Sequence, residues 1–126
     1  MASLEDLLFS KEHEWVRVDG DSATIGITDY AQNALGDIVY VELPKVGTTI
    51  AQFANVGVIE SVKAVSDLFT PISGEVIEVN GALESDPAAV NREPYGTGWL
   101  LKLRPTNPDE TKSLLSSAEY EKIAAD

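Results

Sequence analysis

A six-residue pattern occurs twice in this chain, and it constrains the fold more than any other feature of the sequence. The segment Gly36–Val41 reads Gly, acid, two aliphatic residues, a variable position and Val, and Gly74–Val79 repeats that order. Both copies have the β-branched character of strands, and turn-like residues stand on either side of each. A strand unit duplicated within one small domain predicts a barrel or sandwich built from two similar halves. The competing interpretation is that two short β segments resemble each other by chance.

The rest of the N-terminal half predicts a hairpin followed by a short helix. An Asp-Gly pair at 19–20 lies between apolar runs, which is a strong signal for a tight turn within a hairpin over residues 14–27. Thr28 or Asp29 would cap the start of a helix that Gly36 ends. We expect this helix to pack three apolar side chains against the sheet, namely Tyr30, Ala34 and Leu35.

The sequence of the C-terminal third predicts short helices and one strand, which we expect to support the fold rather than to carry functional residues. A capping residue followed by Pro indicates a short helix over residues 85–90, and a turn leads into a strand over residues 99–104. Asn107 and Ser116 each precede a Glu by three positions, the capping-box arrangement that begins a helix. Two short terminal helices are therefore expected within residues 107–126.

Length and charge exclude several classes of function. A chain of 126 residues is long enough for one compact domain and too short for two of ordinary size. Its 21 acidic and 9 basic residues give a formal charge of −12, which disfavours nucleic-acid and membrane surfaces because phosphate binding depends on clustered Lys and Arg. The acidity favours partners with basic patches, although solubility alone would also explain it. No apolar stretch is long enough to span a bilayer.

Few residues are available for catalysis. There are no cysteines, so disulfides, thiolate metal sites and thiol nucleophiles are excluded. His13 is the only histidine, and we expect it to be structural rather than part of a hydrolytic triad. Scattered carboxylates do not predict a metal site, and no phosphate-binding glycine motif is present. A catalytic pair of carboxylates is left open, because nothing in the sequence brings a particular pair together.

Among the candidate residues for chemistry, Lys63 is the one that these arguments do not exclude. Apolar, β-branched residues approach it from both sides, which places it at or beside a tight reversal between two strands. A nucleophilic lysine needs a lowered pKa, whereas the neighbouring Glu60 and Asp67 would favour its protonated form. Covalent attachment makes a different demand, because a separate enzyme supplies the activated acyl group and needs only an amine that protrudes at a fixed position. We therefore interpret Lys63 as an attachment point.

The residues around Lys63 match a known pattern. Positions 60–67 read Glu-Ser-Val-Lys-Ala-Val-Ser-Asp, and Pro-Ile-Ser-Gly-Glu-Val-Ile-Glu-Val-Asn follows at 71–80. Both blocks closely resemble the lipoyl-attachment region of the glycine cleavage H-protein family. The similarity extends from about His13 to Tyr120, through further matching segments at 13–16, 26–32, 35–44 and 90–99.

The resemblance implies a fold and a domain organisation. It implies a mainly β protein with short helices, a flattened, lipoyl-domain-like barrel or sandwich of two quasi-symmetric halves with helices at the C-terminus. The chain would form a single lipoyl-carrier domain over residues 1–126, with an N-terminal segment at 1–12 and a C-terminal helical segment at 107–126. Biotin carriers resemble one another in placing Met on both sides of the modified lysine, whereas Val62 and Ala64 stand there in this chain. Lipoyl domains of 2-oxoacid dehydrogenase complexes lack the His13-Glu14-Trp15 opening and the C-terminal helices.

The implied function is a relay by a carrier that is not itself an enzyme. Lipoate in amide linkage to Lys63 would accept an aminomethyl group from glycine at a pyridoxal-phosphate decarboxylase (the P protein). A tetrahydrofolate-dependent aminomethyltransferase (the T protein) would take the one-carbon unit, and dihydrolipoamide dehydrogenase (the L protein) would reoxidise the cofactor. A lipoate ligase, or a lipoyl or octanoyl transferase, would attach it at the hairpin, which consists of Glu60, Ser61, Val62, Lys63 and Ala64. A monomer is expected, with no nucleic acid, membrane or metal as a partner.

The resemblance also implies a shelter for the loaded arm. An aminomethyl group on the arm is cationic and prone to hydrolysis, and the family folds the loaded arm into a surface cleft. The matching positions are Glu14 and Asp67, whose carboxylates would hold the cation by charge-assisted hydrogen bonds. The competing interpretation is that both are solvated surface acids.

The cellular compartment and the function of the chain each have alternative interpretations. The opening Met1–Asp6 lacks the features of a secretory signal or a transit peptide, so we expect either a bacterial cytoplasmic protein or a mature chain of the mitochondrial matrix whose presequence has been removed. A second role would be a lipoate relay, in which Lys63 holds lipoate only to donate it to other acceptors. A third, an independent hydrolase, would depend on His13.

Overall fold

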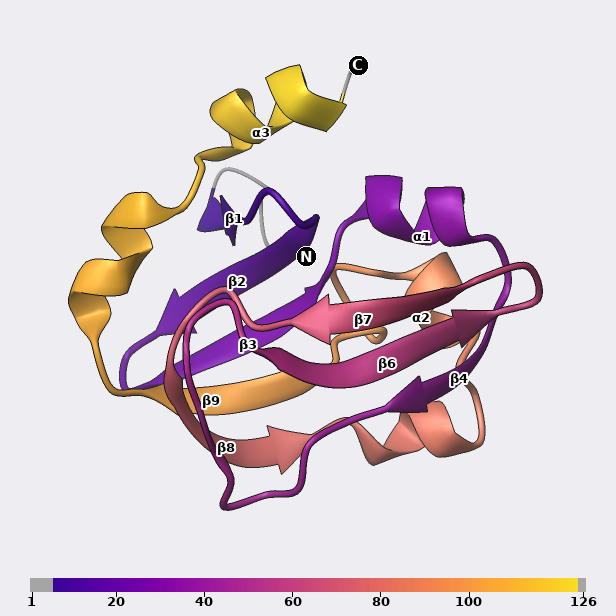
Figure 1. Cartoon of the computed structure of the whole chain (residues 1–126), viewed down its shortest axis with the longest axis horizontal. Helices are drawn as coiled ribbons and strands as arrows, with labels where there is room; N and C mark the ends of the chain where they lie inside the picture. The colour runs from indigo at the N-terminus through magenta and orange to yellow at the C-terminus, as the bar shows by residue number, and fades with distance from the viewer. Residues whose placement is uncertain (1–5, 125–126) are drawn as a thin grey trace.

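Two antiparallel β-sheets form the body of the molecule (Figure 1). The computed structural model describes residues 6–124. The larger sheet has the order β1-β2-β3-β9-β8-β5, with β1 at Leu8–Phe9, β2 at Glu14–Asp19, β3 at Ser22–Ile27, β9 at Leu101–Pro105, β8 at Gly74–Val79 and β5 at Thr49–Ile50. The smaller sheet has the order β4-β6-β7, with β4 at Ile38–Glu42, β6 at Asn55–Ser61 and β7 at Val65–Phe69.

The core lies between the two sheets. Ile25 and Leu103 from the larger sheet belong to the same buried cluster as Ile38, Ile59 and Leu68 from the smaller one. Side chains alternate across each strand, so the inner residues of both sheets interdigitate while the outer ones meet solvent. The prediction of a mainly β fold with short helices is confirmed, and its form is a flattened sandwich.

The two copies of the repeated hexapeptide form one strand in each sheet. Gly36–Val41 leads into β4, and Gly74–Val79 is β8. The third residue of each copy, Ile38 or Val76, is buried in the core. A β-bulge follows it in both copies, between Ile38 and Tyr40 in one and between Val76 and Glu78 in the other. Because the irregularity falls at the same place, the repeat reflects a duplicated strand geometry.

The N-terminal hairpin and helix form as predicted, with one correction. β2 and β3 are joined by a tight turn at Gly20, which has a φ of 61°. Helix α1 (Asp29–Leu35) begins at Thr28, whose side chain accepts a hydrogen bond from the backbone N–H of Ala31. Of the three apolar residues expected to pack against the sheet, Leu35 contacts the core, as does Ala31, whereas Tyr30 and Ala34 are exposed. Tyr30 stacks on His13 instead, because the short helix turns only one narrow stripe inward.

The C-terminal elements also differ from the sequence pattern in detail. A 3-10 turn, η2 (Gly81–Glu84), precedes α2 (Ala89–Arg92), which begins after Pro87 rather than with it. The capping box at Ser116 forms: Glu119 accepts from the Ser116 N–H at 2.9 Å and donates its own N–H to the Ser116 hydroxyl at 3.2 Å, at the start of α3 (Ser117–Ala124). The box expected at Asn107 does not form.

The first terminal helix is held by a tertiary contact instead of a capping box. It is a 3-10 helix, η3 (Pro108–Ser113), and the Asn107 side chain accepts from the N–H of Asp109. The Glu110 carboxylate accepts from the backbone N–H of Ser73 at 2.7 Å and from its hydroxyl at 2.6 Å. This pair of bonds ties η3 to the loop before β8.

The N-terminal segment is integrated with the sheet as far as the structure describes it. Leu7 and Phe9 are buried in a second cluster with Trp15 and Tyr120, and the Phe9 N–H donates to the carbonyl of Leu115 at 2.8 Å. The prediction about the opening residues concerns Met1–Asp6, of which residues 1–5 lie outside the described part of the chain. Among residues 6–124, every helix is too short or too polar to cross a bilayer.

Candidate functional site

Lys63 lies in the turn between β6 and β7, at the tip of a hairpin that projects from one end of the smaller sheet (Figure 1). Its apolar neighbours are turned outward, with Val62 69% and Val65 66% exposed. Val62, Lys63 and Ala64 form the three-residue connection between the strands. The structure thus places Lys63 at a tight reversal, as the sequence predicts.

Backbone and side-chain hydrogen bonds hold this tip in one shape. The Ser61 N–H donates to the Ala64 carbonyl at 2.8 Å, and the Ser61 hydroxyl oxygen accepts from the N–H of Ala64 at 3.0 Å and of Lys63 at 3.3 Å. The Val62 N–H donates to the Asp37 carbonyl at 3.0 Å, which anchors the turn to the segment before β4. Ser61 therefore fixes the direction in which Lys63 leaves the backbone.

The Lys63 side chain lies over Gly36, where the chain has no side chain of its own. A Cβ added to Gly36 would stand 3.3 Å from Lys63 Cε. Glu60 lies beside the tip in the central strand, opposite Tyr40 on β4 and Val65 on β7. Within residues 6–124, Lys63 forms no ion pair with a carboxylate. Lys63 is thus exposed and outside any ion pair in the described part of the chain.

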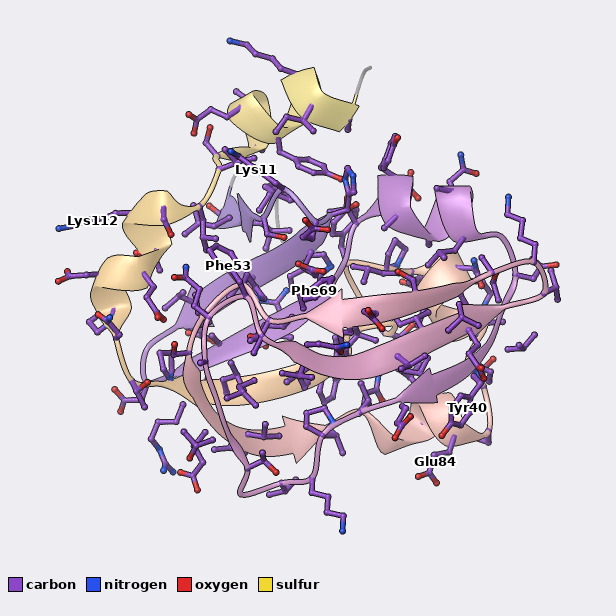
Figure 2. All side chains as sticks on the ribbon, viewed as in Figure 1. Lys11, Tyr40, Phe53, Phe69, Glu84 and Lys112 are labelled. Carbon is purple, nitrogen blue, oxygen red and sulfur yellow. The ribbon has the colours of Figure 1, made fainter. Side chains whose placement is uncertain are left out.

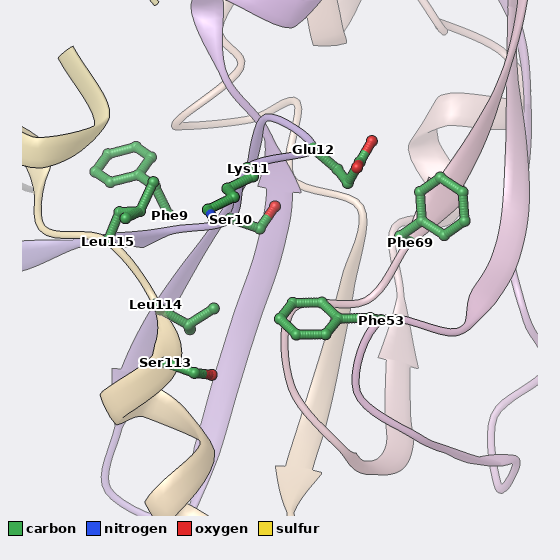
Figure 3. Close-up of a pocket in the computed structure, with 9 residues that line it drawn as sticks. All are labelled: Phe9, Ser10, Lys11, Glu12, Phe53, Phe69, Ser113, Leu114 and Leu115. Carbon is green, nitrogen blue, oxygen red and sulfur yellow. The ribbon is translucent and has the colours of Figure 1, made fainter. Parts of the chain in front are cut away.

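An apolar cleft of about 360 Å³ opens near the other end of β7 (Figure 3). Phe53 and Phe69 form one side of it, facing Phe9, Leu114 and Leu115 on the other. We call it the aromatic cleft. Side chains of β7 alternate, so Val65, Asp67 and Phe69 share one face of the strand and lead from the hairpin tip toward the cleft. Four residues of strand span roughly 13 Å.

Glu14 is only 2% exposed, and it is hydrogen-bonded to two residues that line the aromatic cleft, Ser10 and Phe69. The hydroxyl of Ser10, a cleft residue, donates to Glu14 Oε1 at 2.6 Å and accepts from the Glu14 N–H at 3.2 Å. Burial raises the pKa of Glu14 to about 8, and the hydrogen bonds from Ser10 and the Phe69 backbone oppose that rise only in part. The carboxyl is therefore mostly protonated at neutral pH when the cleft is empty. This burial excludes the alternative of a solvated surface acid for Glu14.

Asp67 is exposed and lies on β7 between the tip and the cleft. Asp67 lies opposite Val58 of the neighbouring strand β6. It stands two residues before Phe69, so the two side chains lie on the same face of β7. No hydrogen bond joins Asp67 to Glu14 within residues 6–124. Asp67 thus lies on the strand that joins the tip to the cleft, and Glu14 is buried and hydrogen-bonded to Ser10, which lines the cleft.

The raised pKa of Glu14 predicts a pH dependence of stability. Between pH about 4.5 and 8 the folded state holds a proton on Glu14 that the unfolded chain releases, so unfolding becomes easier as the pH rises through this window. The slope contributed by this group is at most about 1.4 kcal/mol per pH unit. Glu14→Gln keeps an acceptor for Ser10 and should flatten the slope, as measured by urea unfolding from pH 5 to 8.5. Equal slopes in the two proteins would show that Glu14 ionises normally.

His13 belongs to a structural network. Its Nδ1 lies 2.7 Å from the hydroxyl of Tyr120, which lies 2.6 Å from the Thr28 hydroxyl. Its ring also stacks on Tyr30 with centroids 4.5 Å apart, and burial lowers its pKa. Neither a serine hydroxyl nor a carboxylate is hydrogen-bonded to His13 in the described part of the chain. The network links α3 to the start of α1, which is the structural role that the sequence predicts.

Sequence reasoning proposes none of the residues that line the aromatic cleft as site residues. They come from four separate segments, at 9–12, 53, 69 and 113–115. The sequence offers one weak signal, an aromatic residue at 53 in a short segment of small and polar residues. No group of three or more acidic or His side chains within residues 6–124 is arranged to hold a metal ion.

Comparisons with known proteins agree with this geometry. The family model described as "Glycine cleavage H-protein" matches residues 7–126. A glycine cleavage system H protein from Listeria monocytogenes serotype 4b is 53% identical over 98% of both chains, and one from Symbiobacterium thermophilum is 55% identical over 92% of this chain and 91% of its own. The crystal structure of an H protein from Mycobacterium marinum superposes with a TM-score of 0.89 at 41% identity, covering 97% of this chain and 98% of that one. This chain therefore belongs to the glycine cleavage H-protein family.

Proposed function

We propose that Lys63 carries lipoate in amide linkage and that the chain is thereby the lipoyl carrier of the glycine cleavage system. The observation that carries this proposal is the position of Lys63, exposed at the tip of a hydrogen-bonded hairpin and outside any ion pair within residues 6–124. An amine so placed is accessible to a lipoate ligase or a lipoyl or octanoyl transferase, and Ser61 orients it. When bound, the lipoyl group supplies a disulfide that accepts the aminomethyl group and is reduced.

The chain's own contribution is to present the arm rather than to catalyse. Three partners would use it in turn: the pyridoxal-phosphate decarboxylase, the tetrahydrofolate-dependent aminomethyltransferase and dihydrolipoamide dehydrogenase. A fixed tip replaces the diffusion of free cofactor by a high effective concentration at each docked enzyme. The bacterial relatives favour a cytoplasmic setting.

The aromatic cleft supports the second part of the proposal, a shelter for the loaded arm. Asp67 lies on the strand that runs from the tip to the cleft, and the buried Glu14 is hydrogen-bonded to Ser10 in the lining of the cleft. A cationic amine that reaches Glu14 would favour the ionised carboxylate, so docking would release the proton that burial holds there. Glu14 and Asp67 would then hold the cation by charge-assisted hydrogen bonds, while Phe69 and Leu114 exclude water.

Two assays on one lipoylated sample separate this function from a lipoate relay. In the first, glycine, the decarboxylase, the aminomethyltransferase, tetrahydrofolate and dihydrolipoamide dehydrogenase with NAD⁺ as the oxidant are added, and carbon dioxide and methylene-tetrahydrofolate are measured. In the second, an unmodified lipoyl domain and a lipoyl transferase are added, and movement of lipoate to the new acceptor is followed by mass. We expect turnover of glycine in the first assay. Transfer to the acceptor together with no turnover of glycine would establish the relay and contradict the carrier.

A further inference from the structure

Phe53 has a backbone conformation that aromatic residues disfavour. Its φ is 65°, and His13 is the only other non-glycine residue with a positive φ among residues 6–124. In this left-handed region the Cβ of an L-residue crowds the backbone, so Gly is the residue that adopts it freely. Gly would relieve this strain, so the aromatic side chain at this position calls for an explanation other than the backbone.

Neighbouring hydrogen bonds enforce this conformation. The Phe53 N–H donates to the Thr70 carbonyl at 2.6 Å, and the Thr70 N–H donates to the Ala54 carbonyl at 3.1 Å. The N–H of Gln52 donates to the Ser73 hydroxyl at 2.8 Å, and its side-chain amide donates to the Ser113 hydroxyl at 3.0 Å. The segment is thus bonded on both sides of Phe53, and its backbone conformation does not depend on the Phe53 side chain.

The ring itself contributes little to the core. It is 49% exposed, and it belongs to neither of the two buried clusters. It lies beside the aromatic cleft together with Phe69, close to the end of β7 (Figures 2 and 3). Leu114 and Leu115 stand on the opposite side, and Ser10, the partner of Glu14, lies between the two sides. The ring therefore forms one exposed side of the cleft whose lining includes Ser10, the hydrogen-bond partner of Glu14.

We propose that Phe53 is a positioning residue that closes the mouth of the aromatic cleft over the loaded arm and keeps water from its cargo. This inference rests on the proposed function of Lys63. Hydrolysis of the cargo consumes one water, breaks the carbon–sulfur and carbon–nitrogen bonds, and returns the thiol, formaldehyde and ammonium. An apolar ring over the alkyl part of the arm removes the space in which that water would stand. Docking of the arm would cover the part of the ring that is exposed.

Phe53→Gly separates this role from a structural one. Removing the ring while relieving the strained φ should leave the free energy of unfolding equal to that of the parent or higher. The lipoylated variant should be loaded from glycine by the decarboxylase as the parent is. Its loaded form should then decay several-fold faster, measured by intact mass and by release of formaldehyde. Phe53→Leu, which keeps apolar bulk, should decay at nearly the parent rate.

Tyr40→Ala serves as a matched control, because Tyr40 is equally exposed but lies on β4, outside the cleft. A parent-like lifetime of loaded Phe53→Gly would overturn the inference, and so would a clear loss of its folding stability. Neither outcome touches the proposed function, whereas a parent protein that is not lipoylated at Lys63 contradicts that function directly.

Discussion

Replacement of Lys63 by Arg should abolish lipoylation and reduce glycine cleavage in the reconstituted system to the level without carrier. The guanidinium remains protonated under all physiological conditions and cannot form the amide. The side chain is exposed at the hairpin tip, so the substitution keeps the charge and disturbs no core contact. Lipoylation is measured by intact mass, glycine cleavage by carbon dioxide release, and folding by urea unfolding, in which the variant should match the parent.

Lys45→Arg is the matched control for this prediction. Lys45 is also an exposed lysine, but it lies in the loop between β4 and β5. The Lys45→Arg variant should be lipoylated at Lys63 and should support glycine cleavage as the parent does. Activity that persists in Lys63→Arg and depends on added lipoate would mean that another amine carries the cofactor.

Replacement of Trp15 by Ala should have the largest effect on stability. Trp15 is fully buried, its indole N–H donates to the Pro94 carbonyl at 3.0 Å, and its ring lies directly over Gly26 on β3. A Cβ at Gly26 would stand 2.6 Å from the indole, so this glycine leaves the space that the ring fills. Removing the ring opens a cavity and leaves the Pro94 carbonyl without its donor. We expect a loss of about 3–5 kcal/mol in the free energy of unfolding, measured by urea denaturation.

The second tryptophan provides the comparison. Trp99 is partly exposed, and the amine of Lys102 lies 5.0 Å from the centre of its ring. Trp99→Ala should therefore lose clearly less stability than Trp15→Ala. A loss below about 1 kcal/mol for Trp15→Ala would contradict its place in the core.

The fold is predictable from the sequence where the signal is local. The repeated hexapeptides, the turn at Gly20 and the reversal at Lys63 each depend on residues close together in the chain, and all three are observed. Asn107 shows where local reasoning fails. Its pattern predicts a capping box with Glu110, but Glu110 binds Ser73, which is 37 residues away. A tertiary contact of this kind leaves no signal near Asn107.

The site is predictable in part for the same reason. The residues of the attachment hairpin are contiguous in sequence, whereas the aromatic cleft is assembled by folding from distant segments. Glu14 and Asp67 are proposed through resemblance, and the sequence alone does not show that one is buried and the other exposed. The left-handed backbone of Phe53 arises from bonds to Thr70 and is likewise hidden in the sequence.

The most direct test of the account is to incubate the unmodified protein with lipoate, ATP and a lipoate ligase and to map the product by peptide mass spectrometry. The account predicts one lipoyl group per chain, on the peptide that contains Lys63. A folded protein that stays unmodified, or that gains its lipoyl group on a different lysine, would contradict it.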